Sequence, residues 1–184
     1  KCISQLPKID KYWLALIYFS SKYYHKSFGQ TAFTSIPRSI KDVNTYLPGK
    51  KISKIEKLLN QVEVTEQKNH DFKDLVLNSD QKHAVKIILE SRKPVLLHGV
   101  TGSGKTRVYA KSIQETLKKI PNSQILLLVP EIGLTPQAFE NMSTMLNGIE
   151  INLFHSEQTP NLRSKIWLSS LKGKPSLIIG TRIS

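Results

Sequence analysis

A glycine-rich run near the middle of the chain has the residue types and spacing of a phosphate-binding loop. It matches the pattern G-x-x-x-x-G-K-[ST], and its informative members are Gly99, Thr101, Gly102, Ser103, Gly104, Lys105 and Thr106. The glycines allow several backbone N–H groups to point at one anion. Lys105 is expected to contact the β- and γ-phosphates of a nucleotide, and the Thr106 hydroxyl to bind the accompanying Mg²⁺. We predict a nucleotide site with Lys105 and Thr106 as catalytic residues.

The segments around this loop predict an α/β fold. Their apolar runs lack alternation, which is typical of strands buried on both faces, and helical segments separate them. The predicted strands are 94–98, 124–129, 149–154 and 175–179, and the predicted helices are 79–90, 104–119, 135–146 and one that Thr159-Pro160 opens. Asn78 or Ser79 is the predicted cap of the first helix, and Thr135 of the third. The pattern therefore predicts a parallel sheet covered on both faces.

Composition limits the class of protein. Of the 184 residues, 39% are hydrophobic and 22% are charged, which excludes collagen, a coiled coil and a disordered tail. No apolar run approaches the ~20 residues of a membrane span. Lys and Arg number 27 against 14 acids, a net charge of +13 that favours an anionic partner such as nucleic acid, although a solvated basic surface would look the same. The single cysteine, Cys2, allows neither an intrachain disulfide nor a thiolate zinc site and fits a reducing cytosol.

Charge and periodicity divide the chain. Residues 1–60 are strongly basic, whereas 61–74 are acidic, rich in Gln and Asn, and read as a linker, so a boundary is expected near residue 76. The basic part predicts a helix over 9–24 and a short helix over 52–59. Because the chain begins with Lys1 rather than Met and stops just after an apolar strand, we expect an interior piece of a longer protein.

An aromatic cluster in the first predicted helix allows two interpretations. Its lysines, Lys11, Lys22 and Lys26, interleave with Tyr12, Trp13, Tyr18, Phe19, Tyr23, Tyr24 and Phe28. Aromatic rings between cations are suited to stacking unpaired bases. The helical spacing places part of the cluster in a hydrophobic interface, which favours a core role.

Several stretches in register give the chain a resemblance to the PriA family of primosomal replication-restart DNA helicases, within superfamily 2. They are Leu-Asn-Ser-Asp-Gln (77–81), the phosphate-binding loop with its preceding segment (96–106), Leu-Val-Pro-Glu-Ile-Gly-Leu-Thr-Pro-Gln (128–137), Phe-His-Ser (154–156) and Ile-Ile-Gly-Thr-Arg (178–182). The resemblance implies three regions: 1–37 as the end of an amino-terminal DNA-binding domain, 38–76 as a linker or winged-helix remnant, and 77–184 as an incomplete first RecA-like helicase lobe.

The resemblance also implies residue roles. Gln81 would read adenine through its amide, which can donate and accept at once. Two groups would contact DNA, the loop residues Pro130, Glu131 and Gly133, and the strand-end residues Gly180, Thr181 and Arg182. The implied cofactors are ATP and Mg²⁺, with zinc held only by residues past Ser184. The implied partners are forked and single-stranded DNA, a single-stranded-DNA-binding protein and other primosome proteins, in a bacterial, nucleoid-associated cytoplasmic setting without membrane attachment.

The activity implied for the whole protein is ATP-driven 3′-to-5′ DNA unwinding at stalled forks. The family's Asp-Glu-Glu-His box and second motor lobe would lie past Ser184, so the 184 residues alone are expected to be inactive. A full winged-helix domain does not fit between residues 37 and 77. Two alternatives stay open: another superfamily 2 translocase, RecG-like or restriction-type, and a DNA-binding module with a non-catalytic nucleotide site.

Overall fold

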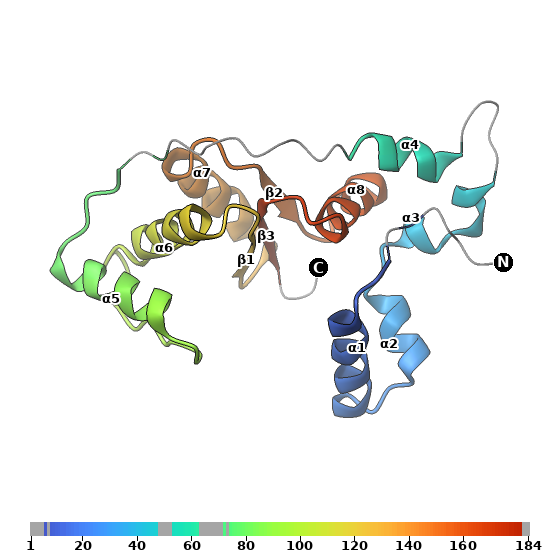
Figure 1. Cartoon of the computed structure of the whole chain (residues 1–184), viewed down its shortest axis with the longest axis horizontal. Helices are drawn as coiled ribbons and strands as arrows, with labels where there is room; N and C mark the ends of the chain where they lie inside the picture. Colours follow the sequence, from blue (N-terminus) through green and yellow to red (C-terminus); the bar gives the residue numbers. More distant parts are fainter. Residues whose placement is uncertain (1–5, 7, 48–52, 63–71, 73, 182–184) are drawn as a thin grey trace. The chain divides into compact units, whose positions relative to one another are not determined.

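The computed structural model describes residues 6, 8–47, 53–62, 72 and 74–181 (Figure 1). These fall into two compact units. The first takes described residues from 1–65 and 157–174, and the second from 66–156 and 175–184. The predicted boundaries at residues 37 and 76 come from composition and from the resemblance rather than from contacts in space, and they stay a prediction.

The second unit contains a parallel sheet of three strands: β1 (Gln124–Val129), β2 (Ile151–Phe154) and β3 (Ser176–Thr181). Their order is β1-β3-β2, so β3 is central and pairs in parallel with both neighbours. All three strands were expected from the sequence, each within about two residues of its predicted bounds. The α/β prediction with a parallel sheet is confirmed.

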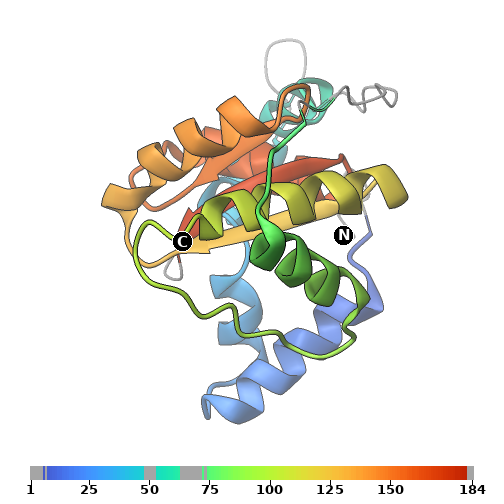
Figure 2. The ribbon, with the colours of Figure 1, turned by 90° about the vertical axis from the view of Figure 1, so that its left-hand side faces the viewer.

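Helices α6 (Lys105–Lys119) and α7 (Thr135–Met145) cover one face of this sheet (Figure 2). Their apolar residues bury the alternate side chains of the strands in one core. Buried members of this core are Ala110, Ile113, Leu117, Met142, Leu146, Leu177 and Ile179. On the opposite face of β1, Leu126 and Leu128 are 64% and 56% exposed, so the expected cover on both faces is wrong for this strand.

The predicted strand over 94–98 is also wrong. These residues carry no strand assignment and pair with none of the three strands. Leu97 packs against Val85 and Val108 in the layer between two helices, while Leu96 is 89% exposed. An apolar run predicts that a segment is buried, but it does not show which strand the segment pairs with. The sequence signal alone therefore does not establish that 94–98 belongs to the sheet.

Helix α5 (Ser79–Glu90) precedes this segment and packs on α6. Asn78, one of the two predicted caps, is its N-cap and makes a reciprocal capping box with Gln81, whereas Ser79 is already helical. The predicted cap of α7 is wrong: Thr135 is already helical, and its hydroxyl donates to the Ile132 carbonyl oxygen at 2.6 Å. That bond joins α7 to the short 3₁₀ helix η2 (Ile132–Leu134).

The first unit is helical. Its elements are α1 (Lys11–Tyr23), α2 (Phe28–Thr34), α3 (Arg38–Lys41), η1 (Val43–Tyr46), α4 (Lys54–Asn60) and α8 (Pro160–Leu171). Thr159 caps α8 as predicted, and α8 packs with α3 and α4. Buried Ile40, Ile55, Leu58, Val62 and Leu168 form the shared core. Lys172 ties this arrangement together by donating to the carbonyl oxygens of Leu59 and Val62, both at 3.0 Å.

Within the described part of the chain, no helix has the length and apolar character needed to cross a membrane.

Candidate nucleotide-binding site and strand ends

The glycine-rich loop leads directly into the first turn of α6. Gly102 and Gly104 have φ values of +82° and +81°, in the left-handed region that favours glycine. Gly104 is the N-cap of α6, so the loop presents the positive end of a 15-residue helix. The Ser103 N–H donates back to the Val100 carbonyl oxygen at 3.2 Å, which tightens the loop. A loop of this kind, which runs into a helix N-terminus, can direct backbone N–H groups at an anion.

Lys105 folds back over this loop. Its Nζ donates to the carbonyl oxygens of Gly99 at 2.6 Å and Val100 at 2.9 Å. The ammonium group is therefore held beside the backbone that would surround a phosphate. Thr106, half-buried, follows it in the first turn of α6, as a Mg²⁺ ligand in this motif should. No cluster of three or more His, Cys, Asp or Glu side chains occurs among the residues that the structure describes. The role of Thr106 as a metal ligand stays a prediction.

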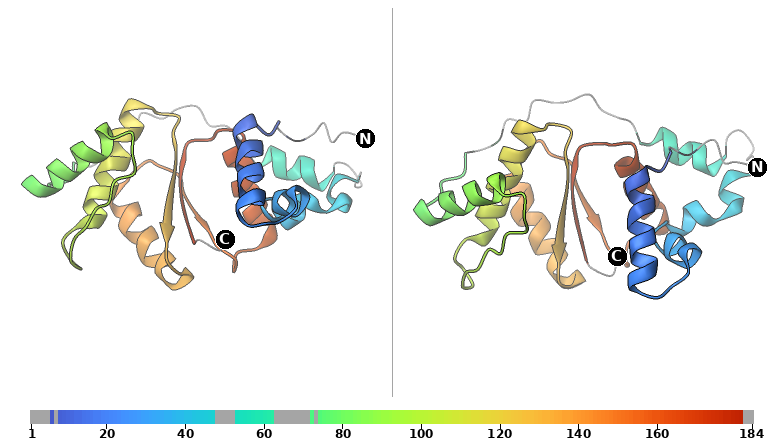
Figure 3. Two further views of the ribbon diagram at one scale, coloured as in Figure 1. Left: turned by 90° about the horizontal axis from the view of Figure 1, so that it is seen from below. Right: turned by 60° about the horizontal axis from the view of Figure 1, so that its bottom comes forward.

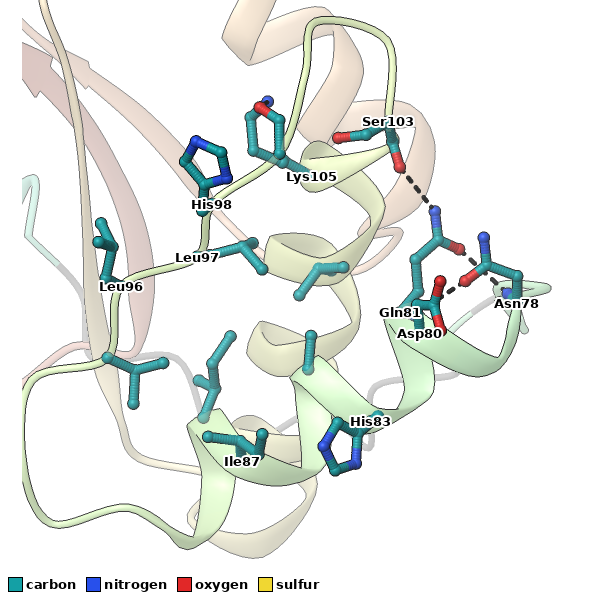
Figure 4. Close-up of a pocket in the computed structure, with 15 residues that line it drawn as sticks. Asn78, Asp80, Gln81, His83, Ile87, Leu96, Leu97, His98, Ser103 and Lys105 are labelled. Atoms are coloured by element: carbon teal, nitrogen blue, oxygen red, sulfur yellow. Dashed lines mark hydrogen bonds between the residues drawn. The ribbon is translucent and has the colours of Figure 1, made fainter.

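Gln81 connects α5 to the loop. Its Nε2 donates to the Ser103 carbonyl oxygen at 3.1 Å, while its Oε1 accepts the Asn78 N–H at 3.1 Å (Figure 4). A Cβ added at Gly104 would collide with the Gln81 amide nitrogen, so a larger residue there would have to displace the Gln81 side chain. Both ends of the Gln81 amide are therefore engaged with protein groups. To contact an adenine edge, the amide must exchange at least one of these bonds.

A cavity of about 750 Å³ opens beside the loop, between α5 and the segment that follows it (Figure 4). Its walls are mainly apolar, with polar groups at the rim, which suits a small ligand. The lining residues are Asn78, Asp80, Gln81, His83, Ala84, Ile87, Ile88, Val95, Leu96, Leu97, His98, Gly99, Ser103, Lys105 and Val108. His98 was not singled out from the sequence, although its position directly before the glycine-rich loop was a visible signal.

The sheet brings the two predicted DNA-binding groups to one edge. In the parallel register Val129 pairs with Thr181, so the first residue after β1 lies next to the end of β3. Pro130, Glu131 and Gly133 are all exposed. Thr181 is only 7% exposed. Arg182 lies outside the described residues.

The two predicted glycines at this edge differ in their surroundings. A Cβ at Gly180 would lie 2.8 Å from the Phe154 carbonyl oxygen, because β2 packs closely beside β3. Nothing lies within 4 Å of a Cβ built at Gly133. Local packing therefore accounts for Gly180, whereas it does not require a glycine at position 133.

Comparison with known proteins identifies relatives of the chain. Residues 78–183 match a family model described as DEAD/DEAH box helicase. Replication restart protein PriA of Rickettsia conorii is 33% identical over 172 residues, which cover 93% of this chain and 24% of that protein. PriA of Haemophilus influenzae is 46% identical over 87 residues, or 47% of this chain and 12% of that protein. PriA of Bacillus subtilis is 34% identical over 113 residues. The predicted resemblance is confirmed, and the chain spans about a quarter or less of the length of these relatives.

Proposed function

Because the chain belongs to the DEAD/DEAH box helicase family, we propose that it forms part of an ATP-dependent DNA helicase that restarts replication at stalled forks. The observation that carries the proposal is the geometry of the glycine-rich loop, which runs into the N-terminus of α6 and accepts hydrogen bonds from Lys105 Nζ at the carbonyl oxygens of Gly99 and Val100. The similarity to PriA proteins over 93% of the chain supports the choice of replication restart. Unwinding in the 3′-to-5′ direction and assembly with primosome proteins belong to the same proposal.

The nucleotide would be ATP with Mg²⁺, and each predicted residue has a defined task. Loop N–H groups and the α6 terminus receive the phosphates, and Thr106 holds the metal. Lys105 would leave the carbonyl oxygens of Gly99 and Val100 and move its charge to the β- and γ-phosphates. Gln81 would give up one of its two hydrogen bonds to the protein and form a hydrogen bond to the adenine edge instead. When bound, Mg²⁺ neutralises charge that develops on the phosphoryl oxygens.

DNA would bind at the carboxyl edge of the sheet, where open α/β sheets place ligands. The exposed loop after β1 offers Pro130, Glu131 and Gly133 to a single strand, and the open space at Gly133 supports a close approach of the DNA backbone. Gly180, Thr181 and Arg182 are the proposed phosphate contacts at the end of β3. The packing of Gly180 and the burial of Thr181 suit a supporting position for both, which leaves Arg182 as the proposed charged contact.

The test is Lys105→Ala in a protein of the relatives' length. We expect loss of ATP hydrolysis and unwinding with largely unchanged binding to forked DNA, because Lys105 serves nucleotide phosphates and other cations serve DNA. Lys118→Ala is the matched control, since Lys118 lies in the last turn of the same helix and pairs with Glu115. Equal loss of DNA affinity and hydrolysis in Lys105→Ala would contradict separate sites. Failure of the unaltered protein to bind an ATP analogue would favour a DNA-binding module with a degenerate loop.

A further inference from the structure

The two ends of the Gln81 amide are bound to different parts of the protein. Its Oε1 accepts the Asn78 N–H at 3.1 Å, while the Asn78 side chain accepts the Gln81 N–H at 2.8 Å, and this pair begins helix α5. Its Nε2 donates to the Ser103 carbonyl oxygen, which belongs to the glycine-rich loop. A bound base can replace the Ser103 bond without opening the start of the helix. Gln81 therefore offers a base its donor, while its acceptor stays in the cap.

Recognition of adenine needs an acceptor as well as this donor. The N6 amino group of adenine donates, and a ring nitrogen beside it accepts. Guanine and hypoxanthine carry the oxygen O6 in place of the amino group. An acceptor in the protein therefore binds the amino group but is repelled by O6, because neither of the two oxygens carries a hydrogen. A site that prefers adenine should hold such an acceptor close to the Gln81 donor.

Asp80 supplies an acceptor next to Gln81 in the first turn of α5. Both residues line the cavity beside the glycine-rich loop (Figure 4). Asp80 is exposed, and its carboxylate has no hydrogen-bond or ion-pair partner among the residues that the structure describes. Two other polar side chains of the cavity are less suited, because Lys105 can only donate and Asn78 Oδ1 already accepts the Gln81 N–H.

The wall of the cavity beyond this turn is apolar. Ala84, Ile87 and Ile88 follow Asp80 at one to two helical turns along α5 and line the same cavity. Helix α5 packs on α6, which lies beside it and begins at the glycine-rich loop (Figure 3). One helix thus provides an apolar surface for the flat face of a base and polar groups for its edge.

We propose that Asp80 is a specificity-determining residue of the nucleotide site, which accepts the N6–H of adenine beside the donor from Gln81. The two contacts hold one edge of the base, so loss of either lets the base turn away from the other. This inference rests on the proposed function, because it concerns the same nucleotide site. A carboxylate in the first turn also stabilises the N-terminus of α5, but that role would affect every nucleotide alike.

The test titrates the 184-residue chain with ATP, purine riboside triphosphate and inosine triphosphate, each with a fluorescent label on the ribose. Purine riboside lacks the N6 amino group, and inosine has O6 in its place. Asp80→Ala should weaken ATP binding about 2- to 12-fold, the equivalent of one hydrogen bond, and change binding of purine riboside triphosphate by less than about 2-fold. Asp80→Asn can donate to O6, so it should improve binding of inosine triphosphate relative to ATP by about 2- to 12-fold.

The matched control is Glu90→Ala, which removes an exposed carboxylate from the other end of α5 and should leave all three affinities unchanged. Equal losses on ATP and purine riboside triphosphate in Asp80→Ala would assign the carboxylate to helix stability and overturn the proposal. A preference for ATP that persists in Asp80→Ala but disappears in His83→Ala, which also lines the cavity, would assign recognition to the imidazole and overturn it too.

Two outcomes separate this inference from the proposed function. If Lys105→Ala abolishes ATP binding while Asp80→Ala leaves it unchanged, the proposed nucleotide site stands and the role of Asp80 fails. If the unaltered chain binds none of the three nucleotides, the nucleotide site itself is refuted, and the role of Asp80 with it.

Discussion

Gln81 offers a sharp test because one amide is proposed for two tasks. In the structure its Oε1 completes the capping box with Asn78, and its Nε2 holds the Ser103 carbonyl oxygen. The Gln81→Glu variant keeps the acceptor for the Asn78 N–H but removes the donor. The Gln81→Ala variant removes both. Comparing the two separates helix capping from the bond to the loop and from recognition of adenine.

The expected magnitudes follow from the bonds that each change removes. Gln81→Ala loses two hydrogen bonds between neutral groups, which should lower the free energy of unfolding by about 1–2 kcal/mol. Gln81→Glu keeps one of them and adds a negative charge in the first turn of α5, worth about 0.3–1 kcal/mol of stabilisation. Its stability should therefore stay close to that of the unaltered chain. Without a donor to adenine, either variant should bind ATP about 2- to 12-fold more weakly, the equivalent of one hydrogen bond.

The assay combines thermal unfolding followed by circular dichroism with titration of fluorescent ATP and GTP analogues. The unaltered chain should prefer ATP, and Gln81→Glu should lose that preference while keeping its melting temperature. A Gln81→Glu chain that still preferred ATP would refute recognition of adenine by this amide. A drop in melting temperature as large as that of Gln81→Ala would show that the Ser103 bond, rather than the capping box, stabilises the fold here.

Three further predictions concern stability and use the same unfolding measurement. Gly180→Ala should destabilise the chain by about 1–3 kcal/mol, because the added Cβ would lie 2.8 Å from the Phe154 carbonyl oxygen in β2. Gly133→Ala has open space around its Cβ and should change stability by less than about 0.5 kcal/mol. Equal losses of stability in the two variants would contradict the packing argument. His25 has a φ of +52°, a strained value for a residue with a Cβ. His25→Gly should raise the free energy of unfolding by about 0.5–1 kcal/mol, once the greater backbone entropy that glycine gives the unfolded chain is subtracted. A loss of stability in this variant would count against strain at this turn. Hydrogen bonds from the Ser53 side chain and backbone lower the pKa of Glu56. The stability that they add is therefore present above the ordinary glutamate pKa and is lost as the pH falls through the lowered pKa of Glu56. Glu56→Gln should remove this loss of stability at acid pH, and an unchanged pH profile of stability would exclude the capping box as its cause.

Local signals in the sequence predicted most of the helices and strands that follow residue 77. Asn78 and Gln81 stand at capping-box spacing, and Thr159-Pro160 is typical of a helix start, so these boundaries depend on neighbours along the chain. The glycine-rich loop was equally predictable, because its left-handed φ values favour glycine at fixed positions in the sequence. Features that depend on distant partners were less predictable. The helical spacing of α1 placed Phe19 and Tyr23 on one face, but no periodicity states whether another surface covers that face.

The loop's own hydrogen bonds explain why the motif and its geometry do not by themselves imply tight nucleotide binding. Lys105 is satisfied by two carbonyl oxygens, and the Gln81 amide is satisfied at both ends. Binding ATP therefore exchanges protein hydrogen bonds for ligand bonds, and the net gain per bond is far smaller than the strength of an isolated one. Catalysis needs still more, since the γ-phosphoryl charge must be stabilised by several positioned groups. Of those groups, Lys105 and Thr106 are the two that we propose among the described residues.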